Sequence, residues 1–132
     1  MASLDRLSGK DFLIIGRAGM DFYPDPPGTK TEEATHFFAA LGGSSANIGV
    51  ALNKHGAGAS LVTCVSDDAI GRYCLNQLDR YEVDRKHVRI VGGEARNSLA
   101  IVESRVEDHQ SVIYRNGAAD FEMTSDDVQD LE

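Results

Sequence analysis

Continuous apolar runs and helically spaced apolar residues alternate along the first two thirds of this chain. Residues 11–16 and 60–65 are continuous apolar runs bounded by charged, polar or glycine residues, which is typical of strands buried on both faces of a parallel sheet. Residues 48–55 and 69–81 carry apolar side chains three or four positions apart, which predicts amphipathic helices. The alternation predicts an α/β fold with a parallel sheet flanked by helices.

Other segments are predicted to form strands and turns. Residues 22–40 contain all three prolines of the chain and then a polar stretch, which predicts turns and a short strand. Residues 88–91, 98–103 and 111–115 are strand-like runs separated by turn residues, which indicates a meander.

The two ends of the chain differ from the segment between them. Residues 1–10 are polar and are expected to form a leader, so the domain is expected to span residues 11–132. Near the other end, Thr124 or Ser125 can cap one further helix that begins at Asp126. A helix this short is marginal on its own, so we expect the chain to be the amino-terminal part of a longer protein.

The stretch from Leu41 to Gly56 carries the most informative chemistry. Gly42 and Gly43 permit close approach of a ligand to the backbone, and Asn47 in the first helical turn offers a donor and an acceptor beside free amides. This corner suits a hydroxyl-rich or anionic ligand. Taken alone, the same residues also suit an ordinary loop-to-helix junction, in which Asn47 bonds to local backbone.

Three charged residues that follow predicted strands are candidates for ligand contact. Asp21 lies just past the first strand, where ligands of open α/β sheets gather, and its carboxylate can accept hydrogen bonds from two hydroxyls. Arg17 can pair with an acidic substrate or with Asp21. Arg115, at a strand end, can form a forked pair with a carboxylate or phosphate, or a salt bridge to one of the many acidic residues.

The composition limits the classes of partner. The 132 residues carry a net charge of -8 with a pI near 4.9, no basic run and no apolar stretch of membrane-spanning length. We therefore expect one soluble, cytoplasmic domain with no nucleic-acid and no membrane partner. Cys64 and Cys74 are expected to be buried free thiols, and the four histidines lack metal-ligand spacing, so we expect no metal site in this chain.

The stretch from Gly42 to Gly56 resembles the first signature of the ribokinase-like (PfkB) carbohydrate kinases. That signature is a glycine pair followed by Asn, a small residue, an amphipathic helix and a glycine. The matching residues are Gly42, Gly43, Asn47, Gly49 and Gly56. Ser45 and Ser66 depart from the residues that the family prefers. The resemblance covers nearly all of the chain but less than half of the family's usual length, and it implies a Rossmann-type fold with a small β-lid.

The second predicted helix resembles a further segment of the family. Asp67 or Asp68 can cap this helix, which begins near Ala69. Glu82 stands where relatives favour a glycine, so a slightly strained helix end is expected there.

The resemblance implies a role for each candidate residue. The expected substrate contacts are Asp21, Gly42, Gly43, Asn47, Arg17 and Arg115. Lid strands are expected within residues 22–40 and 98–115, with Tyr23 and Phe37 as candidates for stacking on a ligand. The lid is also a candidate surface for a homodimer.

The resemblance also implies what this chain does not carry. The catalytic base of these kinases is the Asp of a Gly-x-Gly-Asp loop, and ATP and Mg2+ bind near that loop. Residues 56–59 read Gly-Ala-Gly-Ala, so Ala59 stands where the Asp would be, and we expect only a turn. We therefore expect no catalytic residue in this chain and no kinase activity from it alone.

The resemblance further implies a sugar kinase with an acidic substrate. Tyr114-Arg115 followed by Ala119-Asp120 resembles the members that act on keto-acid sugars and fructose. The expected substrate is 5-dehydro-2-deoxygluconate, with fructose, 2-keto-3-deoxygluconate and ribose as alternatives. Two other hypotheses are a non-catalytic sugar-binding module and a structural fragment in which residues 42–47 only pack.

Overall fold

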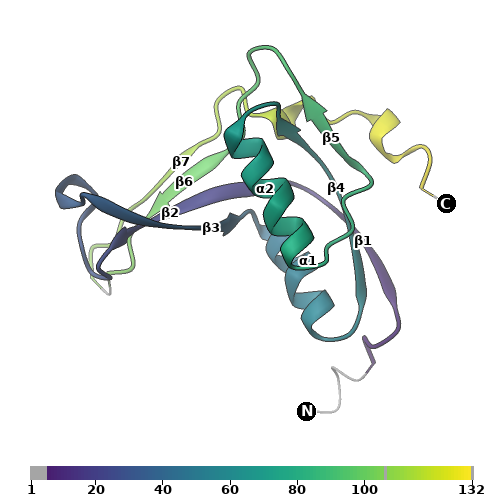
Figure 1. Cartoon of the computed structure of the whole chain (residues 1–132), viewed down its shortest axis with the longest axis horizontal. Coiled ribbons are helices and arrows are strands. Elements are labelled where there is room, and N and C mark those ends of the chain that lie inside the picture. Colours follow the sequence, from purple (N-terminus) through teal and green to yellow (C-terminus); the bar gives the residue numbers. More distant parts are fainter. Residues whose placement is uncertain (1–5, 106, 132) are drawn as a thin grey trace.

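The structure, a computed structural model, describes residues 6–105 and 107–131, whose strands form two sheets (Figure 1). The first sheet is parallel with the order β1-β4-β5, and comprises β1 (Asp11–Ile15), β4 (Gly58–Ser66) and β5 (Val88–Val91). The second is mixed with the order β3-β2-β6-β7, and comprises β2 (Gly19–Asp25), β3 (His36–Gly42), β6 (Leu99–Val102) and β7 (Ser111–Tyr114). The second sheet projects away from the body that the first sheet forms.

Two helices supply the hydrophobic core of the parallel sheet. Helix α1 (Ser44–Lys54) joins β3 to β4, and α2 (Ala69–Arg80) joins β4 to β5. Leu61 and Val65 of β4 are fully buried in one cluster with Cys74 and Leu78 of α2. Together with the parallel pairing, this packing confirms the predicted α/β fold. Among the described residues, no helix has the length and apolar character needed to cross a membrane.

The prediction that the first strand is buried on both faces is wrong. In β1, Leu13 is 45% exposed and Ile15 is 58% exposed, because these alternate side chains lie on one face of the sheet that no other described element covers at β1. Cys64 of the central strand is only 1% exposed. Two short 3-10 segments, η2 (Ala119–Glu122) and η3 (Ser125–Val128), lie against β4 but do not cover these two side chains of β1.

Two predictions for the last third of the chain are also wrong. The three strand-like runs do not form a meander, since β5 pairs in parallel with β4 while β6 and β7 form an antiparallel pair in the other sheet. No α-helix begins at Asp126, where the chain instead forms the 3-10 segment η3. There the Asp127 carboxylate accepts from the Thr124 N–H at 2.8 Å and from Arg89 at 2.7 Å, which ties this turn to β5.

Several local predictions are confirmed. Asp68 caps α2, because its Oδ1 atom accepts from the backbone N–H groups of Ile70 and Gly71, both at 3.0 Å. Glu82 has a φ of 59°, the left-handed conformation that favours glycine. Residues 56–59 run from the turn after α1 into the start of β4, and both cysteines are free and buried.

Candidate functional site

Asp21 lies within β2 and not in a loop after the first strand. β2 pairs with β3 so that Asp21 lies opposite Ala40. Gly42 lies two residues after Ala40 and therefore on the same face of the sheet as Asp21. A Cβ atom on Gly42 would lie 2.1 Å from Asp21 Oδ1, so a side chain at this position would displace the carboxylate. The glycine at the end of β3 therefore makes the space that Asp21 occupies.

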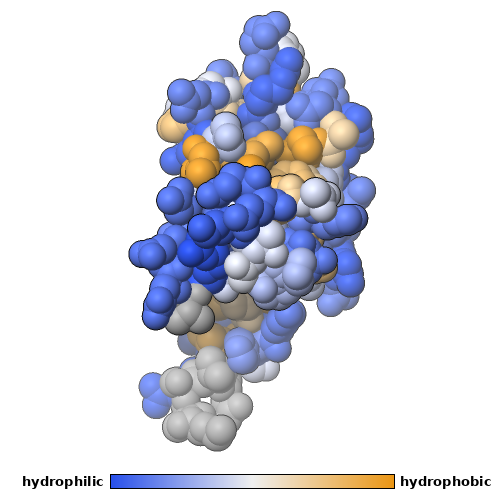
Figure 2. Space-filling view, turned by 90° about the vertical axis from the view of Figure 1, so that its left-hand side faces the viewer, coloured by the Kyte–Doolittle hydropathy of each residue, from blue (hydrophilic) through white to orange (hydrophobic). Residues whose placement is uncertain are grey.

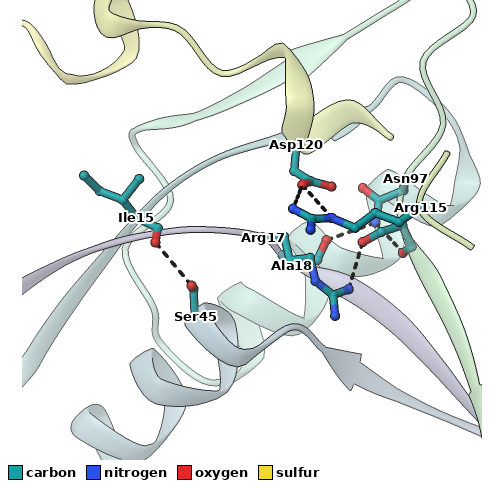
Figure 3. Close-up of polar contacts among 8 residues, drawn as sticks. Ile15, Arg17, Ala18, Ser45, Asn97, Arg115 and Asp120 are labelled. Atoms are coloured by element: carbon teal, nitrogen blue, oxygen red, sulfur yellow. Dashed lines mark hydrogen bonds and ion pairs between the residues drawn. The ribbon is translucent and has the colours of Figure 1, made fainter. Parts of the chain in front are cut away.

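Gly43 brings the same turn against Arg17. Gly43 is the N-terminal cap of α1 and has a φ of 91°, a conformation that suits glycine. A Cβ atom there would lie 2.4 Å from the Arg17 carbonyl oxygen. Beside it, the Ser45 hydroxyl donates to the Ile15 carbonyl oxygen at 3.3 Å (Figure 3). The glycine pair and the segment from Arg17 to Asp21 thus form one cluster.

The surroundings of Asp21 shift the pKa of its carboxyl group. Partial burial raises the pKa of its carboxyl group, and the nearby charge of Arg17 and a hydrogen bond from Tyr23 partly offset this rise. The Tyr23 hydroxyl donates to Asp21 Oδ2 at 3.4 Å. An ionised carboxylate has further lone pairs, so Asp21 can still accept hydrogen bonds from ligand hydroxyls.

Strand register defines which side chains share a face with Asp21, because successive side chains alternate between faces. This face, which we term the Asp21 face, carries Asp21, Tyr23, Phe38, Ala40, Ala100 and Ile113. Phe37, predicted to stack on a ligand, pairs with Pro24 and lies on the opposite face. The aromatic residue beside Tyr23 is Phe38, which is 66% exposed. Sequence reasoning missed it because it did not fix the register of β3.

Asn47 occupies the first turn of α1 as expected. Its backbone N–H donates to the Gly43 carbonyl oxygen at 3.0 Å. Its side chain is exposed and makes no hydrogen bond to the part of the chain that the structure describes. The local backbone therefore does not use the Asn47 carboxamide, which can meet a ligand beside the first amides of α1.

Arg115 follows β7 and pairs with an acidic residue. Nε and Nη2 of Arg115 both donate to Asp120 Oδ2, at 3.1 and 2.5 Å, and the guanidinium lies 4.5 Å from the ring centre of Phe121. Asp120 is 4% exposed, and its Oδ1 atom has no hydrogen-bond partner among the described residues. Continuing the strand register places Arg115 beside Ser98 and on the Asp21 face. The structure thus has the salt bridge that the sequence left as an alternative.

A cavity of about 720 Å³ lies beside β6 and β7, displaced from this cluster. Its walls include Leu99, Ile101 and Tyr114 from the face opposite Asp21, together with Ile113 from the Asp21 face. Its polar groups, those of Arg96, Asn97, Tyr114 and Asn116, include neither a carboxylate nor a glycine turn, which the cluster at Asp21 combines for binding hydroxyls. The polar cluster at the base of β2 is therefore the better candidate site.

Comparison with known proteins places the chain in a family. The family described as pfkB family carbohydrate kinase matches residues 10–132. The chain therefore belongs to the pfkB family of carbohydrate kinases.

Individual relatives agree with this membership. The chain is 32% identical over 118 residues to a 5-dehydro-2-deoxygluconokinase from Photobacterium profundum, and 33% identical over 123 residues to fructokinase-1 from Zea mays. It is also similar to a solved, uncharacterised sugar kinase from Pyrococcus horikoshii, with a TM-score of 0.80 at 22% identity over 89% of this chain and 38% of that one. A structure of the same kinase in complex with ATP gives a TM-score of 0.78 at 23% identity, over 87% and 37% of the two chains.

The matches span only part of each relative. The two curated relatives are matched over 89% and 92% of this chain, but over 36% and 38% of their own length. The chain thus spans little more than a third of the proteins it resembles.

Proposed function

We propose that this chain is the substrate-binding and lid-bearing part of an ATP-dependent sugar kinase. The proposed substrate is an acidic keto-sugar, 5-dehydro-2-deoxygluconate. The observation that carries this proposal is the contact between the glycine pair and the segment bearing Arg17 and Asp21, in a chain of the pfkB family.

The proposed substrate contacts divide by chemistry. The Asp21 carboxylate and the Asn47 carboxamide bind sugar hydroxyls, while Gly42 and Gly43 let the ligand approach the backbone. Arg17 and Arg115 are the two candidates for contact with the acidic group, because a guanidinium matches a carboxylate in shape and charge. The name of the Photobacterium profundum relative, a kinase of an acidic sugar, supports this choice.

The four-stranded sheet is proposed to be the lid. It projects from the parallel sheet, and its Asp21 face carries the aromatic side chains of Tyr23 and Phe38 beside the cluster. Seen from the side where this sheet projects, apolar groups gather in one band among hydrophilic ones (Figure 2). An exposed apolar sheet of this kind can also pair with a second copy, so we include a homodimer through the lid.

ATP and Mg2+ are assigned to other parts of the whole protein. The described residues contain no group of three or more His, Cys, Asp or Glu side chains that could hold a metal ion. That finding concerns only a metal held by several side chains. The proposal that ATP and Mg2+ bind mainly outside this chain rests on the family resemblance, and we assign no catalytic residue among the described residues. Their role is to bind the sugar and exclude water from it.

Other substrates and a second class of function are tested by the same experiment. Fructose is the leading neutral alternative because of the Zea mays relative, followed by 2-keto-3-deoxygluconate and ribose. The second class is a sugar-binding module without catalysis.

The experiment measures ATP turnover by the whole gene product on a panel of sugars and sugar acids, beside the 132-residue chain. We expect turnover of an acidic keto-sugar by the whole protein and none by the short chain. Sugar binding without turnover by the whole protein would support the binding module. If the whole protein neither binds nor turns over any sugar, residues 42–47 have a packing role only.

A further inference from the structure

The two arginines of the candidate site are held by partners of different charge. Arg115 is held by the carboxylate of Asp120, which balances its positive charge. Arg17 Nη1 instead donates to the neutral hydroxyl of Ser98 at 3.2 Å. Within residues 6–105 and 107–131, no acidic side chain lies within 4.0 Å of the Arg17 guanidinium in an ion pair. The Asp21 carboxylate acts on Arg17 only from beyond ion-pair distance, so the other N–H groups of this guanidinium can bind an anionic ligand.

Ser98, the hydrogen-bond partner of the Arg17 side chain, is a buried residue. It is 1% exposed, and its carbonyl oxygen accepts from the Met20 N–H at 3.2 Å. A Cβ atom on Gly19 would lie 3.1 Å from Ser98 Oγ and 3.3 Å from Arg17 Nη1. The glycine thus leaves room for the Arg17 side chain to reach the hydroxyl.

Asn97 fixes the backbone around this contact. It is 6% exposed, and its Nδ2 atom donates to the carbonyl oxygens of Ala18 at 3.0 Å and Ser98 at 3.1 Å. Its Oδ1 atom accepts from the Ser66 N–H at the end of β4, at 3.4 Å. The Asn97 carboxamide therefore binds both Ala18, the residue after Arg17, and Ser98, the residue that holds the Arg17 side chain.

From this geometry we propose that Ser98 is a specificity-determining positioning residue. Its hydroxyl holds the Arg17 side chain toward the anionic group of an acidic sugar. Asn97 fixes the backbone beside Arg17 and at Ser98. Arg115, whose charge Asp120 balances, contacts the sugar without setting the preference for an acid. This inference rests on the proposed kinase function.

The first test compares the two arginines in the whole gene product. It measures kcat/KM for 5-dehydro-2-deoxygluconate and for the neutral keto-sugar fructose, in Arg17→Gln and Arg115→Gln. We expect Arg17→Gln to lower the acid-to-neutral ratio about 10- to 100-fold, the range for a lost hydrogen bond to a charged group. Arg115→Gln is expected to lower both values by a similar factor.

The second test isolates Ser98. We expect Ser98→Ala to lower the acid-to-neutral ratio roughly 3- to 10-fold through KM, since one neutral partner of Arg17 is lost. Ser98→Thr, which keeps the hydroxyl, is expected to retain the ratio. Ser111→Ala, at an exposed serine of β7, is the matched control and should change nothing.

The outcomes separate this inference from the proposed function. If Arg115→Gln alone abolishes the preference for the acid, the assignment to Arg17 is wrong and the kinase function stands. If Arg17→Gln removes the preference but Ser98→Ala leaves it intact, the role of Ser98 is wrong. If the wild-type protein turns over no sugar, the proposed function itself fails.

Discussion

The two sheets of this protein keep their shape by different means. The central strand β4 of the parallel sheet has fully buried apolar side chains, whereas all four residues of β7 in the mixed sheet are exposed. The mixed sheet is fastened by polar residues, with Asn97 at its base and Glu103 near its far end. The comparison teaches that apolar burial stabilises the body, while a few hydrogen bonds hold the projecting sheet in place.

The largest expected difference between the sheets is in the cost of removing apolar side chains. Leu61→Ala in β4 should lower the free energy of unfolding by about 2–5 kcal/mol, because Leu61 is fully buried and the cavity cannot be filled. Val112→Ala in β7 should cost less than about 1 kcal/mol, since Val112 is 42% exposed. Denaturant unfolding of the whole gene product measures both values. Equal losses would contradict the comparison.

The junction between the sheets should be the next most sensitive place. Asn97→Ala leaves the Ala18 carbonyl and the Ser66 N–H without this partner in a buried setting, so we expect a loss of about 1–3 kcal/mol. Asn116→Ala, at an exposed asparagine, is the control and should change stability by less than about 0.5 kcal/mol. Thermal unfolding measures the shift, and an unchanged midpoint in Asn97→Ala would contradict the anchoring role.

Arg89 holds η2 and η3 against β4, so we expect the loss of its side chain to have a local effect. Arg89 donates to Asp127 at 2.7 and 3.0 Å and to the Glu122 carbonyl oxygen at 2.7 Å. Arg89→Ala should release these segments and speed the reaction of Cys64 with a thiol reagent several-fold. Peptide-resolved labelling of the whole protein measures this rate.

The controls for this labelling are in the same chain. Arg85 makes a similar forked pair with Asp79, at 2.6 and 3.1 Å, but on the exposed surface. Arg85→Ala should leave the Cys64 rate unchanged, as surface pairs contribute little. Cys74, whose pKa burial raises to about 12, should stay unreactive in both variants. Equal rates for Cys64 in the two variants would show that Arg89 does not hold the cover.

The smallest effect is expected at the far end of the mixed sheet and depends on pH. Hydrogen bonds from the N–H groups of Thr31 and Gln110, at 2.8 and 2.9 Å, lower the pKa of Glu103. A folded-state pKa below the ordinary value means that these bonds stabilise the fold at neutral pH and are lost as the pH falls below about 4.5. The amide resonances of both residues should shift together with a midpoint below 4.5. Glu103→Gln should remove that transition, and a midpoint above 4.5 would refute the assignment.

Local features of the fold could be predicted from the sequence, because short-range rules determine them. The cap at Asp68 follows from the preference of Asp for that position, and the left-handed Glu82 follows from the family resemblance, which implies a glycine at that position. Sheet membership could not be predicted in the same way. An apolar run such as residues 88–91 shows that a strand forms but not which strand it joins.

The candidate site shows the same limit. Gly42 and Gly43 marked the turn, but the close contact with Asp21 depends on the register between β2 and β3. Arg115 was recognised as an arginine at a strand end, whereas its pairing with Asp120 depends on how the chain turns after β7. Ser98 carried no signal, because a single serine at the start of a strand is ordinary in a sequence.

The parallel pairing of β2 with β6 also affects how the chain is made. Met20 lies opposite Leu99, so 79 residues (99 minus 20) separate the two partners along the chain. At about 5–20 residues per second, β6 is synthesised roughly 4 to 16 s after β2. During that interval β2 can pair only with β3, and its other edge stays open to other chains. We expect ribosome-bound chains that end before β6 to be cut by protease within β2, and those that extend past β7 to be protected.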